Sequence, residues 1–240
     1  MQQYFAVRKD KDLLYINKDD VYHIKTVMRM KENDKVILVY DNKSYLAKLS
    51  EGYEYGKIIE ELKEEVYDCS ITAYVPMLND DKLSFIFQKG TELGVNRFII
   101  VDFERCKFKI KDEVKSRKLD RYNKIVKEAA EQSRRLNVPI VEDIISYNKI
   151  EKCEGVNIVC SLDKDDVKQI NEVLNIDNVC GNINVVFGPE GGLSSKEENH
   201  LQEKGFVKTS LGHNVLRSET VILYLASIIS YLKLGGKNEF

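Results

Sequence analysis

The sequence predicts an α/β protein with two domains: a small, mostly β domain over residues 1–69 and a larger domain over residues 70–240 that is built on a parallel sheet. Short β-prone runs fill the first segment, and strands alternate with helices in the second, as expected when helices cover a parallel sheet. The chain has 240 residues, 43% hydrophobic and 32% charged. That length suffices for two modest domains, and the composition is typical of a globular protein rather than of a disordered chain or a membrane bundle.

The first domain is expected to be a small β structure. Residues 35–40 (KVILVY) and 44–49 (SYLAKL) have the composition of strands, and the turn-forming pair Asp41 and Asn42 lies between them. A short helix is expected near residues 23–30, and no long amphipathic helix is evident in this segment.

The second domain alternates between strands and helices. Residues 119–133 carry apolar side chains at helical spacing, with basic residues on the other faces of the predicted helix. Further helices are expected over residues 81–93, 195–204 and 218–232. The predicted strands are residues 70–78, 97–102, 139–146, 156–162, 183–188 and 206–212.

Helix signals and sheet geometry indicate where a ligand would bind. Glu197 follows Ser194 by three residues, which is a capping box that starts a helix, and Gly205 supplies the stop. In open α/β sheets, ligands bind beyond the carboxyl ends of the strands. The loops after Leu162, Phe187 and Leu211 are therefore the first place to expect a binding site.

Cysteines and apolar runs exclude several classes of protein. The five cysteines form no CxxC pair and are odd in number, which argues against a zinc site and a disulfide framework. No metal-ligand spacing is found, so we expect no metal. The longest apolar run, residues 221–231, is shorter than the ~20 residues that cross a bilayer, so we expect no membrane association. Charges precede any apolar run in the first ten residues, from which we expect no secretory signal and a cytoplasmic protein.

Charge is distributed unevenly along the chain. The net charge is −2, but residues 102–135 contain 12 Lys and Arg against 7 Asp and Glu. A basic surface on an otherwise acidic protein is typical of phosphate binding at one face. A solvated helix face would give the same count, and charge alone leaves both interpretations open.

A glycine-rich segment, Gly188-Pro189-Glu190-Gly191-Gly192, directly follows an apolar run. Three glycines in five residues let the backbone bend tightly and approach a ligand closely. The spacing matches neither the phosphate-binding loop of nucleotide triphosphatases nor the dinucleotide fingerprint. The segment is either a cofactor loop or a sharp turn from strand to helix, and the motif alone does not separate the two.

Two further polar clusters contain candidate functional residues. Arg217 and Glu219 lie where the last helix begins, where a salt bridge and favourable helix-start electrostatics are the alternative to a catalytic role. Arg105 follows the predicted strand over residues 97–102, and residues 131–135 end the long helix. Arginine forks match phosphate, so these residues predict RNA contact, with surface ion pairs as the alternative. No Ser-His-Asp or Cys-His spacing is present, so hydrolytic chemistry is not expected.

Six segments together resemble the RsmE family of small-subunit rRNA uridine-N3 methyltransferases, in the SPOUT class of knotted proteins. Each segment alone is a weak signal, but their order and spacing are specific to the family. The resemblance covers nearly the whole chain. The matching segments are residues 23–29, 88–95, 104–106, 128–133, 188–192 and 216–220.

The resemblance implies a PUA-like β-barrel that binds RNA, followed by a SPOUT methyltransferase domain with parallel strands and a carboxyl-terminal trefoil knot. It also implies S-adenosyl-L-methionine as cofactor, 16S rRNA of the small ribosomal subunit as partner, and a homodimer. The implied cofactor-binding residues are Leu162, Phe187, Gly188, Pro189, Glu190, Gly191, Gly192, Leu211, Gly212, Val215 and Leu216. The RNA-binding residues expected are Arg8, Arg29, Arg105, Lys107, Gln132, Arg134 and Arg135.

Four positions depart from the family pattern. Asn214 stands where the family usually has a basic residue, and Arg134 stands where glycine is common. Leu193 and Val221 replace a usual aromatic residue and a usual alanine. The first two departures bear on RNA contact, whereas the glycine-rich segment is intact.

Methylation at N3 of uracil requires that a proton leave the ring, because N3 is mostly protonated at neutral pH. A base, or a cation that stabilises the deprotonated ring, should assist. The candidate catalytic residues are Glu190 and Glu219 as the base and Arg217 or Arg105 as the cation, and the sequence does not rank them. N3 lies on the pairing edge, so the target uridine must be unpaired or flipped out. The alternatives are a methyltransferase for another RNA atom, such as a ribose 2′-hydroxyl, and a non-catalytic RNA-binding assembly factor.

Overall fold

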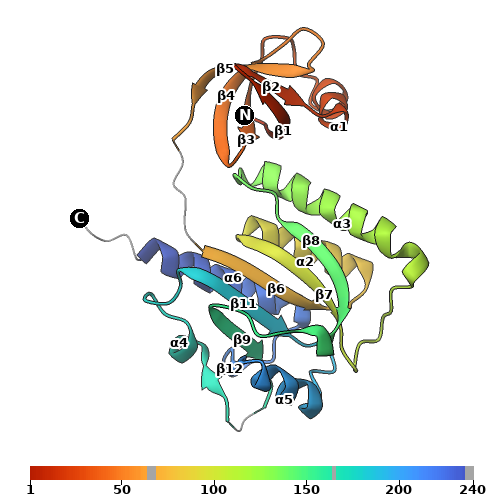
Figure 1. The fold of residues 1–240 in the computed structure, drawn as a ribbon, viewed down its shortest axis with the longest axis vertical. Coiled ribbons are helices and arrows are strands. Elements are labelled where there is room, and N and C mark those ends of the chain that lie inside the picture. Colours follow the sequence, from red (N-terminus) through yellow and green to blue (C-terminus); the bar gives the residue numbers. More distant parts are fainter. Residues whose placement is uncertain (64–68, 164–165, 236–240) are drawn as a thin grey trace. The chain divides into compact units, whose positions relative to one another are not determined.

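The computed structural model describes residues 1–63, 69–163 and 166–235, and the chain divides into two compact units (Figure 1). Residues 1–63 and the segment Glu128–Val138 belong to the first unit, and the other described residues belong to the second. The domain boundary expected between residues 69 and 70 stays a prediction, because residues 64–68 lie outside the described ones.

The first unit contains a closed barrel of five strands in the order β1-β2-β5-β4-β3. Neighbouring strands are antiparallel except for β1 and β3, which are parallel. Buried apolar side chains, among them Leu14, Leu38 and Leu49, form the core of the barrel. The strands are β1 (Gln3–Asp10), β2 (Leu13–Ile16), β3 (Lys35–Tyr40), β4 (Lys43–Leu49) and β5 (Tyr55–Glu61).

The hairpin between β3 and β4 confirms the two strands predicted in this domain. Asp41 and Asn42 join the strands, and both have positive φ angles, 49° and 56°. Two successive positive φ angles are the geometry of a type I′ turn, which matches the twist of an antiparallel hairpin. The hairpin therefore forms at the residues predicted for it.

The short helix expected near residues 23–30 begins earlier than predicted. Helix α1 (Lys18–Tyr22) comes first, and the π-helical segment His23–Val27 follows it. Asn17 caps α1, because its side-chain oxygen accepts a hydrogen bond of 2.8 Å from the N–H of Asp20. The charged residues of α1 precede the apolar positions from which the helix was predicted.

The second unit contains a seven-stranded, all-parallel sheet in the order β10-β12-β9-β11-β6-β7-β8. Central strands β6 and β11 are buried along most of their length, as expected for parallel strands covered on both faces. The strands are β6 (Cys69–Pro76), β7 (Val95–Asp102), β8 (Ile140–Ser146), β9 (Val156–Cys160), β10 (Lys168–Gln169), β11 (Gly181–Phe187) and β12 (Val207–Ser210). The helices are α2 (Asp80–Glu92), α3 (Asp112–Gln132), α4 (Ile170–Val173), α5 (Ser195–Glu203) and α6 (Ser218–Gly235), with a 3-10 turn at Tyr147–Lys149.

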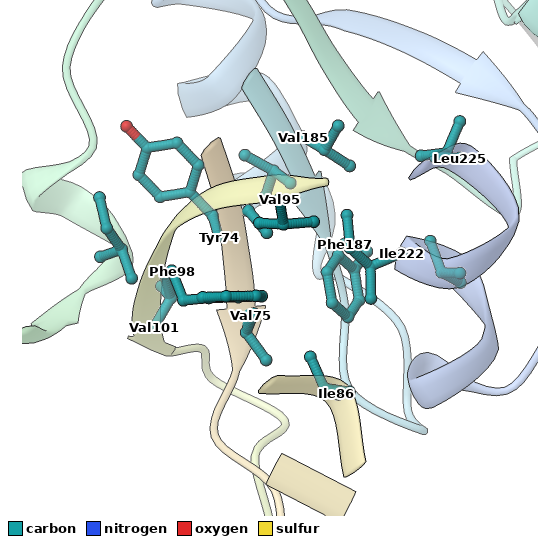
Figure 2. Packing of buried hydrophobic residues seen from close by; sticks show 14 of the residues in the cluster. Tyr74, Val75, Ile86, Val95, Phe98, Val101, Val185, Phe187, Ile222 and Leu225 are labelled. Carbon is teal, nitrogen blue, oxygen red and sulfur yellow. The ribbon is translucent and has the colours of Figure 1, made fainter. Parts of the chain in front are cut away.

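The core of the second unit lies between this sheet and the helices packed on it. Figure 2 shows Val75, Phe98 and Phe187 from three strands near Ile86 of α2 and Ile222 of α6. Helices α2 and α6 contact each other, and α6 also contacts β6 and β11. This packing sets the positions of the first turns of α2 and α6, which contribute to the site described below.

The fold class is confirmed as a small β-barrel followed by an α/β unit with a parallel sheet. The capping box at Ser194 is also confirmed: its Oγ accepts a bond from the N–H of Glu197, whose carboxylate accepts one of 2.7 Å from the N–H of Ser194. Helix α3 starts at Asp112 rather than near residue 119, because its first turns are too charged to show apolar periodicity. The trefoil knot stays a prediction of the family resemblance.

Two composition-based expectations concern the whole chain. All five cysteines are free. Within the described ranges, no helix has both the length and the apolar character that crossing a bilayer requires.

Candidate functional site

A cavity of about 850 Å³ lies at the carboxyl ends of β9, β11 and β12, which are neighbours in the sheet. Its volume is within the range of small-molecule sites, ~300–1,000 Å³. Arg105 and Arg217 line it, whereas Glu219 contacts Lys82. Every residue that the resemblance assigns to the cofactor also lines it, namely Leu162, residues 187–192, Leu211, Gly212, Val215 and Leu216.

Residues 188–193, which we call the glycine loop, follow β11 and bend sharply back toward α5. A Cβ at Gly188 would lie 3.0 Å from the backbone of Gly192, and Gly192 has a φ of 69°. The N–H of Gly192 donates to the carbonyl of Pro189 at 2.9 Å, which closes the turn. Glycine is therefore required here by close approach at one position and by positive φ at another.

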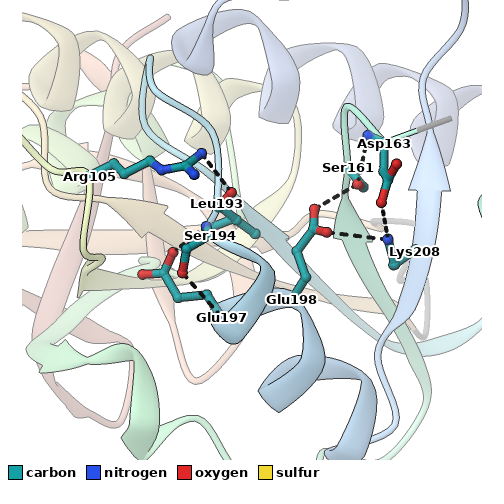
Figure 3. A network of polar contacts seen from close by, with 8 residues as sticks. All are labelled: Arg105, Ser161, Asp163, Leu193, Ser194, Glu197, Glu198 and Lys208. Atoms are coloured by element: carbon teal, nitrogen blue, oxygen red, sulfur yellow. Dashed lines mark hydrogen bonds and ion pairs between the residues drawn. The ribbon is translucent and has the colours of Figure 1, made fainter. Parts of the chain in front are cut away.

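The segment after β7 is bonded to the glycine loop. Nη1 of Arg105 donates to the carbonyls of Gly191 and Leu193 at 2.9 and 3.0 Å, and Figure 3 shows the second of these bonds. A Cβ on Gly191 would lie 3.3 Å from Cβ of Arg105. The N–H of Glu104 donates to the buried carboxylate of Glu197 at 2.7 Å. Arg105, predicted to contact RNA, thus has its guanidinium group on backbone carbonyls of the predicted cofactor loop.

Four charged side chains gather beside the glycine loop. Nζ of Lys82, in the first turn of α2, lies 2.6 Å from Glu190 and 3.2 Å from Glu219 at the start of α6. Lys107 lies 3.2 Å from the other oxygen of Glu190. Hydrogen bonds and charge from Lys82 and Lys107 hold the pKa of Glu190 below its usual range. The two candidate bases named from the sequence therefore share one lysine.

Sequence reasoning did not identify Lys82. A lysine in the charged first turn of a helix is normally solvated, and the residues that it meets are distant in sequence. The packing of α2 on α6 brings Lys82 to Glu219, and the glycine loop after β11 brings Glu190 to the same lysine.

A second polar network borders the cavity (Figure 3). Lys208 of β12 is nearly buried, with 9% of its side chain exposed, and its Nζ lies 2.7 Å from Asp163 and 3.3 Å from Glu198. Ser161 donates a hydrogen bond of 2.7 Å to Glu198. The bonds to Asp163 and Glu198 raise the pKa of Lys208, which keeps it charged. This network was also missed, since one lysine within a predicted strand gives no signal of its partners.

Residues 211–217, which we call the second loop, form the wall that follows β12. Gly212 has a φ of 114°, and the hydroxyl of Ser210 exchanges hydrogen bonds of 3.3 and 3.4 Å with its backbone. Val215 is 74% exposed, and Leu162 from the loop after β9 is 64% exposed. Both are apolar side chains that line the cavity, so they offer apolar surface to a ligand.

The residues predicted to bind RNA fall into two groups. Arg105 and Lys107 belong to the second unit, and the other five belong to the first. The guanidinium group of Arg8 lies 3.9 Å from the ring centre of Tyr15, and Arg29 and Arg134 are exposed with positive φ angles. Gln132 is also exposed.

Arg135 differs from the other predicted RNA-binding residues because it is partly buried. Burial lowers its pKa to about 10, so it stays charged at neutral pH. Its Nη2 donates to Asn137 at 2.9 Å, and its carbonyl accepts a bond of 2.7 Å from Gln3. Arg135 therefore has structural contacts of its own within the first unit.

No group of three or more His, Cys, Asp or Glu side chains that could hold a metal ion is found in the part of the chain that the structure describes. The polar clusters at the cavity instead combine carboxylates with lysines, and Arg105 donates to backbone carbonyls. Such clusters are ion pairs and hydrogen-bond networks, and they bear on ligand binding through charge and positioning.

Comparison with known families and structures agrees with this architecture. The family model described as an RNA methyltransferase domain matches residues 65–230, and one described as an RNA methyltransferase PUA domain matches residues 16–54. Ribosomal RNA small subunit methyltransferase E of Bacillus subtilis is 33% identical, with 96% of each chain covered. Its namesake in Aquifex aeolicus is 30% identical over 95% of this chain and 99% of that one.

A solved structure shows the same fold. The crystal structure of a ribosomal RNA small subunit methyltransferase E from Neisseria gonorrhoeae bound to S-adenosyl methionine superposes with a TM-score of 0.82 at 26% identity. The match covers 97% of this chain and 98% of that one. From the family models, the identity and the coverage, the chain belongs to the ribosomal RNA small subunit methyltransferase E family.

Proposed function

We propose that this protein transfers a methyl group from S-adenosyl-L-methionine to N3 of a uridine in 16S rRNA of the small ribosomal subunit. One observation carries the proposal. The residues that the family resemblance assigns to the cofactor come from three separate loops, and all of them line one cavity at the carboxyl ends of adjacent strands.

The residues at the cavity fit this cofactor. Leu162 and Val215 offer exposed apolar surface for a purine ring, and residues 187–192 line the same cavity. Bound there, S-adenosyl-L-methionine would supply a sulfonium-activated methyl group. The chain itself must fix the loop so that methyl donor and acceptor nitrogen are aligned.

Arg105 contributes to that alignment. Its two hydrogen bonds fix the carbonyls of Gly191 and Leu193 before any ligand binds. A preformed loop reduces the ordering that binding would otherwise require. We therefore propose that Arg105 holds the glycine loop and does not bind RNA.

Removal of the N3 proton is assigned to Glu219 rather than Glu190. A general base works best when its pKa lies near the working pH, and two lysines lower the pKa of Glu190. Glu219 contacts only Lys82 among the ion pairs described, and it is adjacent to Ser218, which lines the cavity. Arg217 lines the cavity as well and is the proposed cation for the deprotonated ring.

The substrate is a uridine whose pairing edge is free, because N3 is inaccessible in a base pair. The exposed side chains Arg8, Arg29, Gln132 and Arg134, together with Lys107, are proposed to contact the rRNA. In a homodimer, the barrel of one subunit can serve the active site of the other. Such an enzyme acts where ribosomes assemble, in the cytoplasm.

The proposal is tested by incubating the purified protein with S-adenosyl-L-methionine carrying a labelled methyl group and small subunits from cells that lack the modification. Label at N3 of one 16S rRNA uridine is expected. Label on a ribose 2′-hydroxyl would identify the enzyme as a methyltransferase for a different atom. Absence of label, with rRNA binding retained, would identify a non-catalytic assembly factor.

A further inference from the structure

One ammonium group joins three segments of the second unit that are far apart in sequence. Lys82 belongs to the first turn of α2, Glu190 to the glycine loop, and Glu219 to the first turn of α6. The distances from Nζ of Lys82 are 2.6 Å to Oε1 of Glu190 and 3.2 Å to Oε2 of Glu219. The lysine therefore lies where the predicted cofactor loop meets the helix that follows the second loop.

Burial separates the pair between Lys82 and Glu219 from an ordinary surface ion pair, whereas Glu190 is 47% exposed. Exposed pairs contribute little because water and salt screen them. The side chain of Lys82 is 23% exposed and that of Glu219 is 17% exposed, and Oε2 of Glu219 is fully buried. By contrast, the side chain of Lys107, which also pairs with Glu190, is 71% exposed. Screening is weakest for the pair between Lys82 and Glu219.

The two carboxylates depend on the lysine between them. Both reach the same nitrogen within 3.2 Å, so without it their negative charges would face each other across a short distance. The charged groups near Glu190 are Lys82 from α2 and Lys107 from the segment after β7, and Glu219 from α6 faces Lys82. If Lys82 is removed, Lys107 is the described ion-pair partner that Glu190 keeps.

A second contact crosses the same junction. Ser218 is buried, and its Oγ donates a hydrogen bond of 2.9 Å to the carbonyl of Gly188. Gly188 begins the glycine loop, and Ser218 begins α6. The loop and the helix are thus joined at one point by Ser218 and at another by Lys82.

We propose that Lys82 is a positioning residue for methyl transfer, which holds Glu190 of the glycine loop and Glu219 of α6 in one arrangement. This inference rests on the proposed function for its kinetic consequence, but the positioning itself is a property of the protein without ligand. Lys82 acts through the two carboxylates.

The kinetic test compares Lys82→Met with Lys82→Arg and with Lys89→Met. Lys89 is the matched control, a lysine of the same helix that pairs with Glu92 three residues later. Methyl transfer to small subunits is measured as a function of pH. K82M is expected to lower kcat by about 10- to 100-fold, the size of effect expected from misplacing a reacting group by about 1 Å. K82R, which keeps the charge, should recover most of kcat, and K89M should match the wild type.

The pH dependence of cofactor affinity adds a readout that loss of stability would not produce. Lys82 lowers the pKa of Glu190, which lines the cavity, so removal of Lys82 raises that pKa. Glu190 then takes up a proton at higher pH, and the fall in cofactor affinity at acid pH begins at a higher pH in K82M than in K89M. A K82M variant that matches K89M both in kcat and in the pH dependence of cofactor affinity would overturn the proposal.

Amide hydrogen exchange tests the positioning without RNA or cofactor, and therefore separately from the proposed function. The hydrogen-bonded N–H groups of Gly192 in the glycine loop and of Thr220 and Val221 in the first turn of α6 should exchange faster in K82M than in K89M, while the centre of β11 is unchanged. If K82M does not fold, Lys82→Gln is measured in its place. Equal exchange in the Lys82 variant and in K89M would overturn the proposal, whether or not the wild type methylates rRNA.

Discussion

The glycine loop and the second loop border the same cavity but are held very differently. Arg105 bonds to two carbonyls of the glycine loop, Ser218 to a third, and Lys82 to the side chain of Glu190. The hydrogen bonds described for the second loop are local, between Ser210 and Gly212 and within the first turn of α6. Its central side chains, residues 213–215, are exposed.

The difference indicates a division of roles between the two walls of the site. When other elements fix a loop before a ligand binds, binding loses little conformational entropy in ordering that loop. A loop with exposed apolar residues gains contacts only when a ligand covers them. We expect the glycine loop to be preformed and the second loop to order on the bound cofactor.

The largest effect is expected from Gly191→Val. The first carbon of the new side chain would lie 3.3 Å from Cβ of Arg105, and its methyl groups would press further into that contact. Overpacking of this kind destabilises the local structure by ~1–3 kcal/mol. The loop relieves it by shifting away from Arg105, and binding must then restore the original loop conformation at a similar cost, so affinity for S-adenosyl-L-methionine should fall by about 10- to 100-fold. Titration calorimetry measures the affinity, and thermal unfolding checks that the fold is kept. Unchanged affinity in a folded variant would show that the glycine loop is not a wall of the cofactor site.

Arg105→Ala should have the next largest effect. It removes two hydrogen bonds that fix the carbonyls of Gly191 and Leu193, and the exposure of Arg105 to solvent reduces their contribution. We expect cofactor affinity to fall about tenfold. Arg97→Ala is the matched control, because Arg97 forms a surface pair with Glu142.

The salt dependence of RNA binding separates the two roles considered for Arg105. A phosphate contact would make RNA affinity less salt-dependent in R105A. We expect the salt dependence of R105A to equal that of the wild type. A reduced slope with unchanged cofactor affinity would restore the interpretation as an RNA-binding residue.

Val215→Ala tests the second loop and should have a smaller effect. The side chain is 74% exposed without ligand, and shortening it removes apolar surface that the cofactor would cover. Affinity for S-adenosyl-L-methionine should fall about three- to fivefold. Val7→Ala, at an exposed valine of the barrel, is the control and should change nothing. A larger loss in V215A than in R105A would reverse the comparison between the loops.

The smallest effect concerns pH. The pKa of Glu190 is lowered in the folded protein, so the contribution of its ion pairs is complete above the ordinary glutamate pKa of about 4.3 and is lost as the pH falls through the lower folded value. Cofactor affinity at low salt should therefore stay nearly constant between about pH 7 and 5. A decline in this range that Glu190→Gln abolishes would contradict the lowered pKa.

Local patterns predicted the secondary structure well, and a cavity lies where sheet geometry predicted a binding site. The turn at Asp41 and Asn42 and the capping box at Ser194 depend on neighbouring residues, so the sequence contains the whole signal. The cavity residues were expected at the carboxyl ends of strands, and three loops do meet there. The charged first turns of α1 and α3 were missed because they lack apolar periodicity.

Partners that depend on tertiary packing could not be predicted. Lys82 and Lys208 look like ordinary lysines in the sequence, and only the packing of α2, α5, α6 and β12 brings carboxylates to them. Arg105 was interpreted as an RNA contact because a guanidinium group suits phosphate. A guanidinium group also donates to backbone carbonyls. In the folded protein, the carbonyls of Gly191 and Leu193 lie within hydrogen-bond distance of Arg105.

Amide hydrogen exchange with and without S-adenosyl-L-methionine tests the central claim most directly. The account predicts slow exchange at Gly192, whose N–H donates to Pro189, before the cofactor is added, and protection of residues 211–217 only after it. Faster exchange in the glycine loop than in the second loop, or no protection of either loop at saturating cofactor, would contradict it.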